Sequence, residues 1–462
     1  MSPPLVSVCV PTRNQAAYLG GAITSALAQD VELEVLVHDD ASLDGTEAVV
    51  RQIADPRVRY LRHERPLGVA RNRSTCLASA YGRYVAWLDS DDEYLPHMLG
   101  RQLAVLEANP GIGLVHGGFH VIAADGERLP DWPAPFRQDT IEPAHEAFRN
   151  LIAGNEVTTS TVVVRGDCHE AAGGFRRGVG ASSSDWDAWL RLALRADVAY
   201  TAEPVARYRQ HAGTISRGTS ASGERLRCDI AVVRRLLSSE RSRLPDRGRV
   251  AAIASAALAA KSLVHAGDLL TRGRREASMR AVALSARLAP GPLARLAPRL
   301  LSSTARGDSY GCYRANKKLL AALAEILEGT RYGAKVSAAA GTDADWEAVL
   351  ARAAEAVRRV VPADARVGAV TKWDPTLLAL SGRRGHNFPD RRRLPDGYPR
   401  DGAAAVAHLE HMWAEGLSHL VLPSASFWWL EHYPALARYL DNRARRLWDD
   451  DDCLIYELPA AR

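Results

Sequence analysis

The stretch that decides the fold is Tyr84–Asp92, with the sequence YVAWLDSDD, in which an apolar run leads directly into three carboxylates within four residues. A continuous apolar run of this kind is typical of a strand buried on both faces, as in a parallel sheet covered by helices. In open α/β sheets, ligands bind beyond the carboxyl ends of the strands. We therefore expect Asp89 and Asp91 to project into a crevice and to share one divalent cation. Asp92 is expected only to cap the helix predicted over residues 94–108.

The segments before this stretch alternate between strands and helices. Strands are predicted at Leu5–Val10, Leu33–His38 and Val58–Leu61, with a helix over Tyr18–Ala28 between the first two. Further helices are expected to start after Asp44 and after Gly68. This order predicts a parallel sheet with right-handed crossovers, in which the polar residues that follow the strands share one edge.

The loop after the first strand helps to exclude two large classes of nucleotide-binding enzyme. Its sequence, Pro11-Thr12-Arg13-Asn14, has neither the glycine pattern of dinucleotide-binding folds nor that of P-loop enzymes. Dehydrogenase and kinase functions are therefore disfavoured. Phosphate would have to be held by a metal at Asp91 and by guanidinium groups such as that of Arg71.

Length and composition indicate a globular protein with more than one core. The chain has 462 residues, 47% apolar and 24% charged, and these values favour two or three folded domains over disorder. A net charge of +5 gives no specific case for nucleic acid as a partner. The six cysteines form no C-x-x-C pair, which fits a reducing compartment.

The sequence contains no signal-peptide pattern and no clear transmembrane span. The longest apolar stretch, Val250–Leu270, is interrupted by Lys261, His265 and Asp268, so it is predicted to be a packed helix. We expect a cytoplasmic protein. Peripheral contact with the inner face of the membrane stays open at this stage.

Several motifs in the first half of the chain occur together and in a fixed order. On them, residues 5 to about 215 resemble a family 2 glycosyltransferase, one of the inverting enzymes with a GT-A fold. Each motif is weak alone, but the set covers nearly half of the chain at family-like spacing. The motifs are Val6–Asn14 (VSVCVPTRN), Asp39–Thr46 (DDASLDGT), Gly68–Asn72 (GVARN) and Leu88–Asp92 (LDSDD).

The resemblance implies a site for a nucleotide-diphosphate sugar, with a divalent metal, Mn²⁺ or Mg²⁺, as cofactor. It matches Asp40 to the residue that contacts the nucleobase, Asp89 to a ribose or diphosphate contact, and Asp91 to the metal ligand. The remaining residues that the resemblance implies at the nucleotide are Pro11, Arg13, Asp39 and Arg71. From its position alone, Arg71 could equally form an ordinary surface ion pair.

A second informative stretch is Ser182–Leu192 (SSSDWDAWLRL), which has the serine and aspartate residues of a helix start. Its tryptophans fall at helical spacing and are predicted to be core. By resemblance, Asp185 matches the general base, although Ser184 stands where the family usually has an acid. Residue type alone leaves Asp185 open as a helix cap, and Asp187 is then the alternative base.

Two further segments resemble parts of the family that lie around the active site. Arg207–His211 resembles a segment that closes over the site, so His211 could contact the metal or the diphosphate; a lone histidine is also common in packing or on the surface. Residues 130–143 suit a loop over the acceptor pocket or an ordinary solvated connection. Gly173-Gly174-Phe175 is expected near the acceptor, or as a helix stop.

The rest of the chain predicts two more parts. The expected division is a GT-A catalytic domain at 1–220, a helical region at 221–340 and a smaller α/β domain at 341–462, which resembles an accessory module attached to bacterial glycosyltransferases. Residues 250–270 and 274–288 are predicted to form an antiparallel helical pair. Its apolar faces need a neighbouring domain or a second subunit, so a homo-oligomer stays open. The aromatic residues Phe427, Trp428, Trp429 and Tyr433 could stack on sugars, but core packing is the commoner use.

The resemblance implies transfer of a sugar, with inversion, from a nucleotide sugar to the hydroxyl of a carbohydrate or lipid-linked acceptor, in bacterial polysaccharide or glycoconjugate synthesis. A sugar nucleotidyltransferase is the alternative enzyme, although the basic, glycine-rich first loop of that class is missing. A third alternative is a noncatalytic carbohydrate-binding protein. The sequence does not identify the donor sugar or the acceptor, because the loops that select them follow no transferable code.

Overall fold

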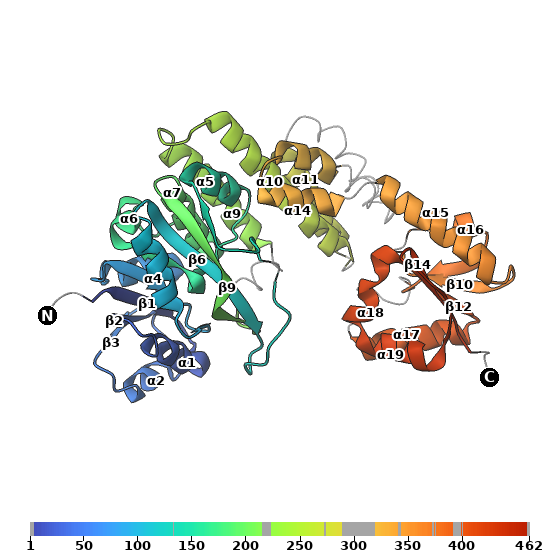
Figure 1. Ribbon diagram of the computed structural model, residues 1–462, viewed down its shortest axis with the longest axis horizontal. Helices are drawn as coiled ribbons and strands as arrows, with labels where there is room; N and C mark the ends of the chain where they lie inside the picture. The colour runs from blue at the N-terminus through green and yellow to red at the C-terminus, as the bar shows by residue number, and fades with distance from the viewer. Residues whose placement is uncertain are drawn as a thin grey trace. The chain divides into compact units, whose positions relative to one another are not determined.

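The structure is a computed structural model that describes residues 4–132, 134–214, 223–271, 274–288, 319–340, 343–371, 374, 376–390, 399 and 401–459 (Figure 1). The chain divides into two compact units. The first unit comprises residues 1–258 together with 329–332, and the second unit comprises 259–328 and 333–462. Each unit contains its own sheet, so the predicted α/β class is confirmed.

The first four strands of the first unit form the parallel sheet that the sequence predicts. They are β1 (Val6–Thr12), β2 (Leu33–Asp39), β3 (Val58–Arg62) and β4 (Tyr84–Trp87), in the order β3-β2-β1-β4. All four run in one direction, so their carboxyl ends meet at the same edge of the sheet. Four of the predicted donor-site residues follow β1, β2 and β4: Arg13, Asp40, Asp89 and Asp91.

Helices cover this part of the sheet because their apolar residues recur at helical spacing. In α1 (Ala16–Leu27), Leu19, Ala22, Ile23 and Ala26 are all fully buried on one face. They share a core with buried residues of β1, β2 and β4 and of α4 (Met98–Ala108). Burial of each large aliphatic side chain stabilises the fold by about 1.5–3 kcal/mol. Two shorter helices, α2 (Thr46–Gln52) and α3 (Val69–Ala78), complete the βα units.

The second half of the sheet is mixed and continues in the order β8-β6-β9-β5, with β7 paired to β9. The strands are β5 (Glu93–Tyr94), β6 (Ile112–Ile122), β7 (Thr140–Glu142), β8 (Val163–Arg165) and β9 (Asp197–Arg209). Strand β6 is parallel to β9, whereas β8 is antiparallel to both β4 and β6. Long strands β6 and β9 lie side by side in Figure 1.

Strand β6 continues without interruption through Gly117 and Gly118. Its pairing with β9 shifts register at these two residues. A Cβ on Gly117 would lie 2.6 Å from Thr201 Oγ1, and one on Gly118 would lie 2.8 Å from the Ala202 carbonyl oxygen. The glycines therefore mark a close approach between strands within one continuous strand, as glycines in strands often do.

Helices α5 (Ala144–Ala153), α6 (Gly166–Ala171), α7 (Ser184–Ala193) and α9 (Glu224–Ser239) complete the first unit. In α7 the tryptophans Trp186 and Trp189 are fully buried, so their predicted core role is confirmed. The helix predicted over residues 94–108 starts later, at Met98, because Glu93 and Tyr94 pair with β9 as strand β5.

The predicted antiparallel helical pair is confirmed. It consists of α10 (Arg247–Thr271), which spans the boundary between the units, and α11 (Arg275–Leu288). Three hydrogen bonds show the antiparallel direction. The Ser262 hydroxyl donates to the Ala281 carbonyl oxygen, that of Ser278 to Ala266 and that of Ser285 to Ala259. By length and composition, residues 247–267 could cross a membrane, but 61% of that window is buried, as in the core helix of a soluble protein.

The C-terminal part of the second unit is a separate sheet in the order β11-β10-β12-β14-β13. The three predicted strands are present as β10 (Arg366–Ala369), β12 (His419–Pro423) and β14 (Cys453–Glu457), and β11 (Arg384–Asn387) and β13 (Arg445–Asp449) flank them. The helices named after α11 in the described part of the chain are α14 (Arg331–Ala340), which begins in the first unit, α15 (Asp343–Val360), α16 (Thr376–Ser381), α17 (Gly402–Ala414), α18 (Trp428–His432) and α19 (Pro434–Arg443), and residues 319–326 are helical as well.

The aromatic run at the start of α18 belongs to the core of this sheet. Trp429 and Tyr433 are buried in one hydrophobic cluster, and Phe427 packs against it. The side chain of Trp428 lies outside the described residues. For the three side chains that the structure describes, the predicted core role is confirmed and stacking on a sugar is not supported.

Candidate active site

The two aspartates that follow β4 lie at the edge of the sheet, as predicted. The Asp89 main-chain N–H donates to Ser160 Oγ (3.0 Å), which fixes the start of the turn. Asp91 Oδ2 lies 2.9 Å from His211 Nε2, so the segment after β9 reaches the end of β4. Burial, and then repulsion by Asp89, raise the pKa of the Asp91 carboxyl. Three of the predicted residues therefore form one group: Asp89, Asp91 and His211.

Asp92 does not cap a helix, which corrects the sequence prediction. Its carboxylate is fully buried and accepts hydrogen bonds from Ser160 Oγ (2.5 Å) and from the Arg209 main-chain N–H (2.8 Å). The helix itself starts six residues later and has His97 as its N-cap. Asp92 therefore ties β4 to β9, because a buried carboxylate needs such partners.

The side chain of Arg209 fixes the backbone of the same turn. Its Nε donates to the Asp91 carbonyl oxygen (2.9 Å), and its Nη2 pairs with Glu93 Oε1 (2.7 Å). The guanidinium also lies over the ring of Tyr18, with its carbon 5.1 Å from the ring centroid. Arg209 and Asp92 together determine where the main chain of Asp91 lies.

The predicted nucleobase residue, Asp40, is buried directly after β2. Its two carboxylate oxygens accept the main-chain N–H groups of Leu67 (2.5 Å) and Gly68 (3.0 Å), which places the loop before α3 against the end of β2. Arg13, which follows β1, lies 3.8 Å from the same carboxylate. The structure thus brings Asp40 and Arg13 together. Pro11 lies within β1, paired with His38.

Asp39, the last residue of β2, is held by hydrogen bonds from its neighbours. Its carboxylate is fully buried and accepts hydrogen bonds from the Ser42 hydroxyl (2.5 Å) and main-chain N–H (2.9 Å) and from the Tyr60 hydroxyl (2.7 Å). Arg71 is half-buried in the first turn of α3 and forms no ion pair among the described residues.

Asp185, the predicted base, lies in the first turn of α7, but it is not the N-cap, which is Ser183. Its Oδ2 accepts long hydrogen bonds from Thr159 Oγ1 (3.3 Å) and Asn155 Nδ2 (3.4 Å). Its Oδ1 is buried and has no hydrogen-bond partner among the described residues. Burial raises the pKa of the Asp185 carboxyl, and the positive charge of Arg73 opposes this rise. A buried carboxylate oxygen without a partner is available to accept a proton.

Arg73 is the residue of the site that the sequence reading missed. It lies on α3, is nearly fully buried, and places its Nη2 2.9 Å from Asp89 Oδ1 and its Nη1 3.4 Å from Ser184 Oγ. The only sequence signal was a second arginine two positions after Arg71. The fold turns this arginine inward, between the end of β4 and the start of α7.

Comparison with known proteins agrees with this geometry. Residues 7–168 match the sequence profile of glycosyl transferase family 2. TuaG of Bacillus subtilis, a putative teichuronic acid biosynthesis glycosyltransferase, is 31% identical over 218 residues, which are 46% of this chain and 82% of TuaG. The chain belongs to glycosyltransferase family 2.

Two other relatives match shorter parts of this glycosyltransferase. The succinoglycan biosynthesis protein ExoO of Rhizobium meliloti is 39% identical over 127 residues, which are 27% of this chain and 36% of ExoO. The Escherichia coli enzyme WfgD, a UDP-Glc:alpha-D-GlcNAc-diphosphoundecaprenol beta-1,3-glucosyltransferase, is 35% identical over 119 residues, which are 26% of this chain and 47% of WfgD. In both cases the match spans less than half of the relative.

A solved structure confirms the fold. Residues 1–349 of TarS from S. aureus, crystallised with UDP-GlcNAc, superpose with a TM-score of 0.52 at 16% identity, covering 68% of this chain and 90% of that chain. At this identity the similarity shows the fold alone. The expected GT-A fold of the family 2 glycosyltransferase is therefore confirmed.

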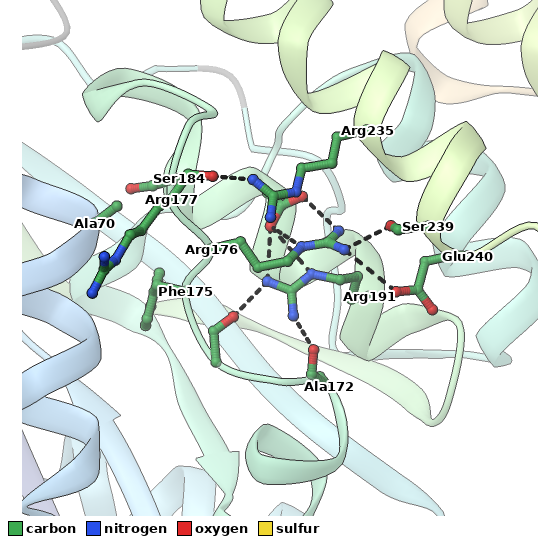
Figure 2. Close-up of polar contacts among 12 residues, drawn as sticks. Ala70, Ala172, Phe175, Arg176, Arg177, Ser184, Arg191, Arg235, Ser239 and Glu240 are labelled. Carbon is green, nitrogen blue, oxygen red and sulfur yellow. Dashed lines mark hydrogen bonds and ion pairs between the residues drawn. The ribbon is translucent and has the colours of Figure 1, made fainter.

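The alternative base, Asp187, has a different environment within the same glycosyltransferase. Its carboxylate is fully buried between Arg176, with nitrogen–oxygen distances of 2.9 and 3.0 Å, and Arg191, at 2.8 Å. Figure 2 shows the two guanidinium groups converging, with Ser239 and Glu240 on the far side of Arg176. Arg191 also donates to the carbonyl oxygens of Ala172 and Gly174. Asp187 therefore anchors the turn that contains Gly173-Gly174-Phe175.

Proposed function

We propose that this glycosyltransferase transfers a sugar, with inversion, from a nucleotide-diphosphate sugar to an acceptor hydroxyl, with Asp185 as the general base. The observation that carries the proposal is the buried, unpartnered Oδ1 of Asp185 at the start of α7. Its raised pKa moves the carboxylate toward the range in which general bases act efficiently. The reaction would be a single displacement: Asp185 takes the proton of the acceptor hydroxyl as that oxygen attacks the anomeric carbon, the bond from this carbon to the diphosphate oxygen breaks, and the nucleoside diphosphate leaves.

On the donor side, the residues at the end of β4 fit a divalent cation. Asp91 and His211 offer an oxygen and a nitrogen 2.9 Å apart, and repulsion between Asp89 and Asp91 would be relieved by a positive ion. Among the described residues, no three acidic, histidine or cysteine side chains form a complete metal cage. Mg²⁺ commonly binds through one or two carboxylates plus substrate phosphates and water, so this incomplete set is suitable. Such an ion would neutralise charge on the departing diphosphate.

The nucleotide would lie along the ends of β1 and β2. Asp40, Arg13 and the backbone at Pro11 are adjacent there, with Asp39 as support, and Arg71 is the guanidinium available for phosphate. The fold similarity to TarS, which was crystallised with UDP-GlcNAc, makes UDP-sugars the first donors to test.

The acceptor that we propose is a carbohydrate or a lipid-linked glycan, in bacterial polysaccharide or glycoconjugate synthesis. The names of ExoO, TuaG and WfgD support this class of pathway, and WfgD acts on a diphosphoundecaprenol-linked sugar. Such an acceptor would place the protein in the cytoplasm, at the inner face of the membrane. Self-association through the helical pair α10–α11 is part of the same proposal.

A donor panel tests the function. The purified protein would be incubated with UDP-, GDP- and dTDP-sugars and Mn²⁺, and slow release of the nucleoside diphosphate is expected for one of them. Pyrophosphate-dependent release of a nucleoside triphosphate would instead indicate a sugar nucleotidyltransferase. No turnover with any donor, together with binding of glycans, would favour a noncatalytic carbohydrate-binding protein.

Removal of the metal ligand gives a separate prediction. In Asp91→Ala, donor binding that depends on Mn²⁺ is expected to be lost, because the carboxylate that faces His211 is gone. Calorimetric titration with the best donor, with and without a chelator, measures this. The matched control is Asp125→Ala, in an exposed turn after β6, for which metal-dependent binding should equal that of the wild type. Unchanged metal dependence in Asp91→Ala would contradict the assignment.

A further inference from the structure

Arg73 connects two parts of the site that come from distant parts of the sequence. Its Nη2 holds Asp89, which follows β4, at 2.9 Å, and its Nη1 lies 3.4 Å from the hydroxyl of Ser184, the first residue of α7. The guanidinium carbon lies 5.7 Å from the centroid of the Phe175 ring. The same side chain therefore touches the donor side of the site, the helix that carries the proposed base, and the turn expected near the acceptor.

Because this guanidinium is buried, its charge acts on neighbouring side chains and not on solvent. The Arg73 side chain is 8% exposed, whereas that of its partner Asp89 is 32% exposed. A buried charge is costly unless opposite charges and hydrogen bonds compensate for it. After Asp89, the next carboxylate that attracts Arg73 is that of Asp185. Arg73 Nε and Asp185 Oδ1 are both buried and both lack a hydrogen-bond partner among the described residues.

Three charged groups have the largest electrostatic effects on the pKa of the Asp185 carboxyl. Arg73 of α3 and Arg225 of α9 supply positive charge, and Asp89 supplies negative charge. The side chains that donate hydrogen bonds to its Oδ2, those of Asn155 and Thr159, are neutral. Of the three charged groups, Arg73 has the largest effect.

We propose that Arg73 is a positioning residue for catalysis, which holds Asp89 and the first turn of α7 in one arrangement and keeps a fixed positive charge beside Asp185. This inference rests on the proposed function, in which Asp185 is the base. An adjacent cation favours the ionised form of a carboxyl group, which is the form that can accept a proton. Arg73 would therefore extend activity to lower pH.

The test is the pH dependence of kcat/KM in Arg73→Gln. The probe is UDP-glucose or UDP-N-acetylglucosamine, whichever the wild type hydrolyses faster, with Mn²⁺ present. Loss of the positive charge should raise the pKa of Asp185 further, so the acidic limb of the profile should move to higher pH by about one unit or more. Arg73→Lys keeps the charge, and its acidic limb should stay within a few tenths of a unit of the wild-type position. Arg51→Gln, an exposed arginine paired with Glu47, is the matched control and should leave the profile unchanged.

A second variant protects the test against a failure to fold. Arg73→Gln leaves Asp89 without its partner, whereas the double variant Arg73→Gln/Asp89→Asn replaces the ion pair by a neutral pair of similar shape. The acidic limb of its pH profile, measured as kcat at saturating donor, should still lie at higher pH than that of the wild type. The reason is that Arg73 affects the pKa of Asp185 more than Asp89 does. If neither variant folds, as judged by thermal melting, Arg73 serves fold stability alone and the proposal is overturned.

The remaining outcomes separate the inference from the function on which it rests. An unmoved acidic limb in folded Arg73→Gln, combined with an inactive Asp185→Asn, would overturn the role of Arg73 and leave the base assignment intact. A fully active Asp185→Asn would instead overturn the proposed function. A limb that moves equally in Arg73→Lys and Arg73→Gln would also overturn the inference, because it would show that the charge is irrelevant.

Discussion

Asp185 and Asp187 lie two residues apart in the first turn of α7, yet their surroundings differ completely. Residues two apart on a helix point to opposite sides, because each residue turns the helix by about 100°. On one side, Asp185 has two weak neutral donors and one carboxylate oxygen without a partner. On the other side, Asp187 is saturated by the guanidinium groups of Arg176 and Arg191. The partners of a carboxylate, and not its place at a helix start, therefore distinguish the proposed base from the structural anchor.

The largest expected effect is on catalysis at Asp185. In Asp185→Asn, transfer should fall by a factor of about 10² to 10⁴, the usual contribution of a general base, because the amide cannot accept the proton. Donor affinity and the melting temperature should change little, since Oδ1 has no partner to lose. The rate of nucleoside diphosphate release and calorimetric donor binding measure the two quantities. Glu146→Gln, an acid in the first turn of α5, is the control and should keep wild-type activity. Unchanged transfer in Asp185→Asn would show that Asp185 is not the general base.

The opposite pattern is expected at Asp187. Asp187→Ala would leave two buried arginines without their carboxylate, and breaking a buried ion pair in this way costs about 3–5 kcal/mol of folding stability. Chemical denaturation followed by circular dichroism measures the free energy of unfolding. The control is Glu47→Gln in the exposed pair with Arg51, for which a change of no more than about 1 kcal/mol is expected. A variant of wild-type stability that had lost transfer would reverse the roles assigned to Asp185 and Asp187.

A smaller effect is expected from the neutral donors of Asp185. Asn155→Ala and Thr159→Val each remove one hydrogen bond to Oδ2, and each should lower kcat by about tenfold or less, because bonds this long are weak and contribute no more than about 1.5 kcal/mol. Steady-state kinetics at saturating donor measure this. A loss as large as that in Asp185→Asn would show that these donors, and not the free oxygen, determine the reactivity of the base.

Much of the fold could be predicted from the sequence, because its signals are local. The apolar strands, the polar residues that follow them and the helical spacing of Leu19, Ala22 and Ile23 led to the parallel part of the sheet. Errors arose where distant residues decide the structure. Tyr94, predicted as the start of a helix, lies with Glu93 in a strand because β9 is beside them. Asp92, predicted as a helix cap, instead accepts a hydrogen bond from the main chain of Arg209 in β9.

The candidate site, like the fold, could be predicted from the sequence only in part. The motifs indicated Asp40, Asp91 and Asp185, since each lies at the end of a strand or the start of a helix. The partners that give these carboxylates different properties come from elsewhere in the chain: Ser160 and Arg209 bind Asp92, and Arg73 lies between Asp89 and Ser184. Such pairings depend on tertiary contacts, so no local pattern could reveal them.

The most direct measurement of the central claim is the anomeric configuration of the first product formed. Proton NMR would follow the hydrolysis of the best donor from the panel in the first minutes, before the free sugar equilibrates between its anomers. If Asp185 activates an oxygen nucleophile for a single displacement, the first sugar released must have the anomeric configuration opposite to that of the donor. A first product with the same configuration as the donor would contradict a single displacement with Asp185 as the base.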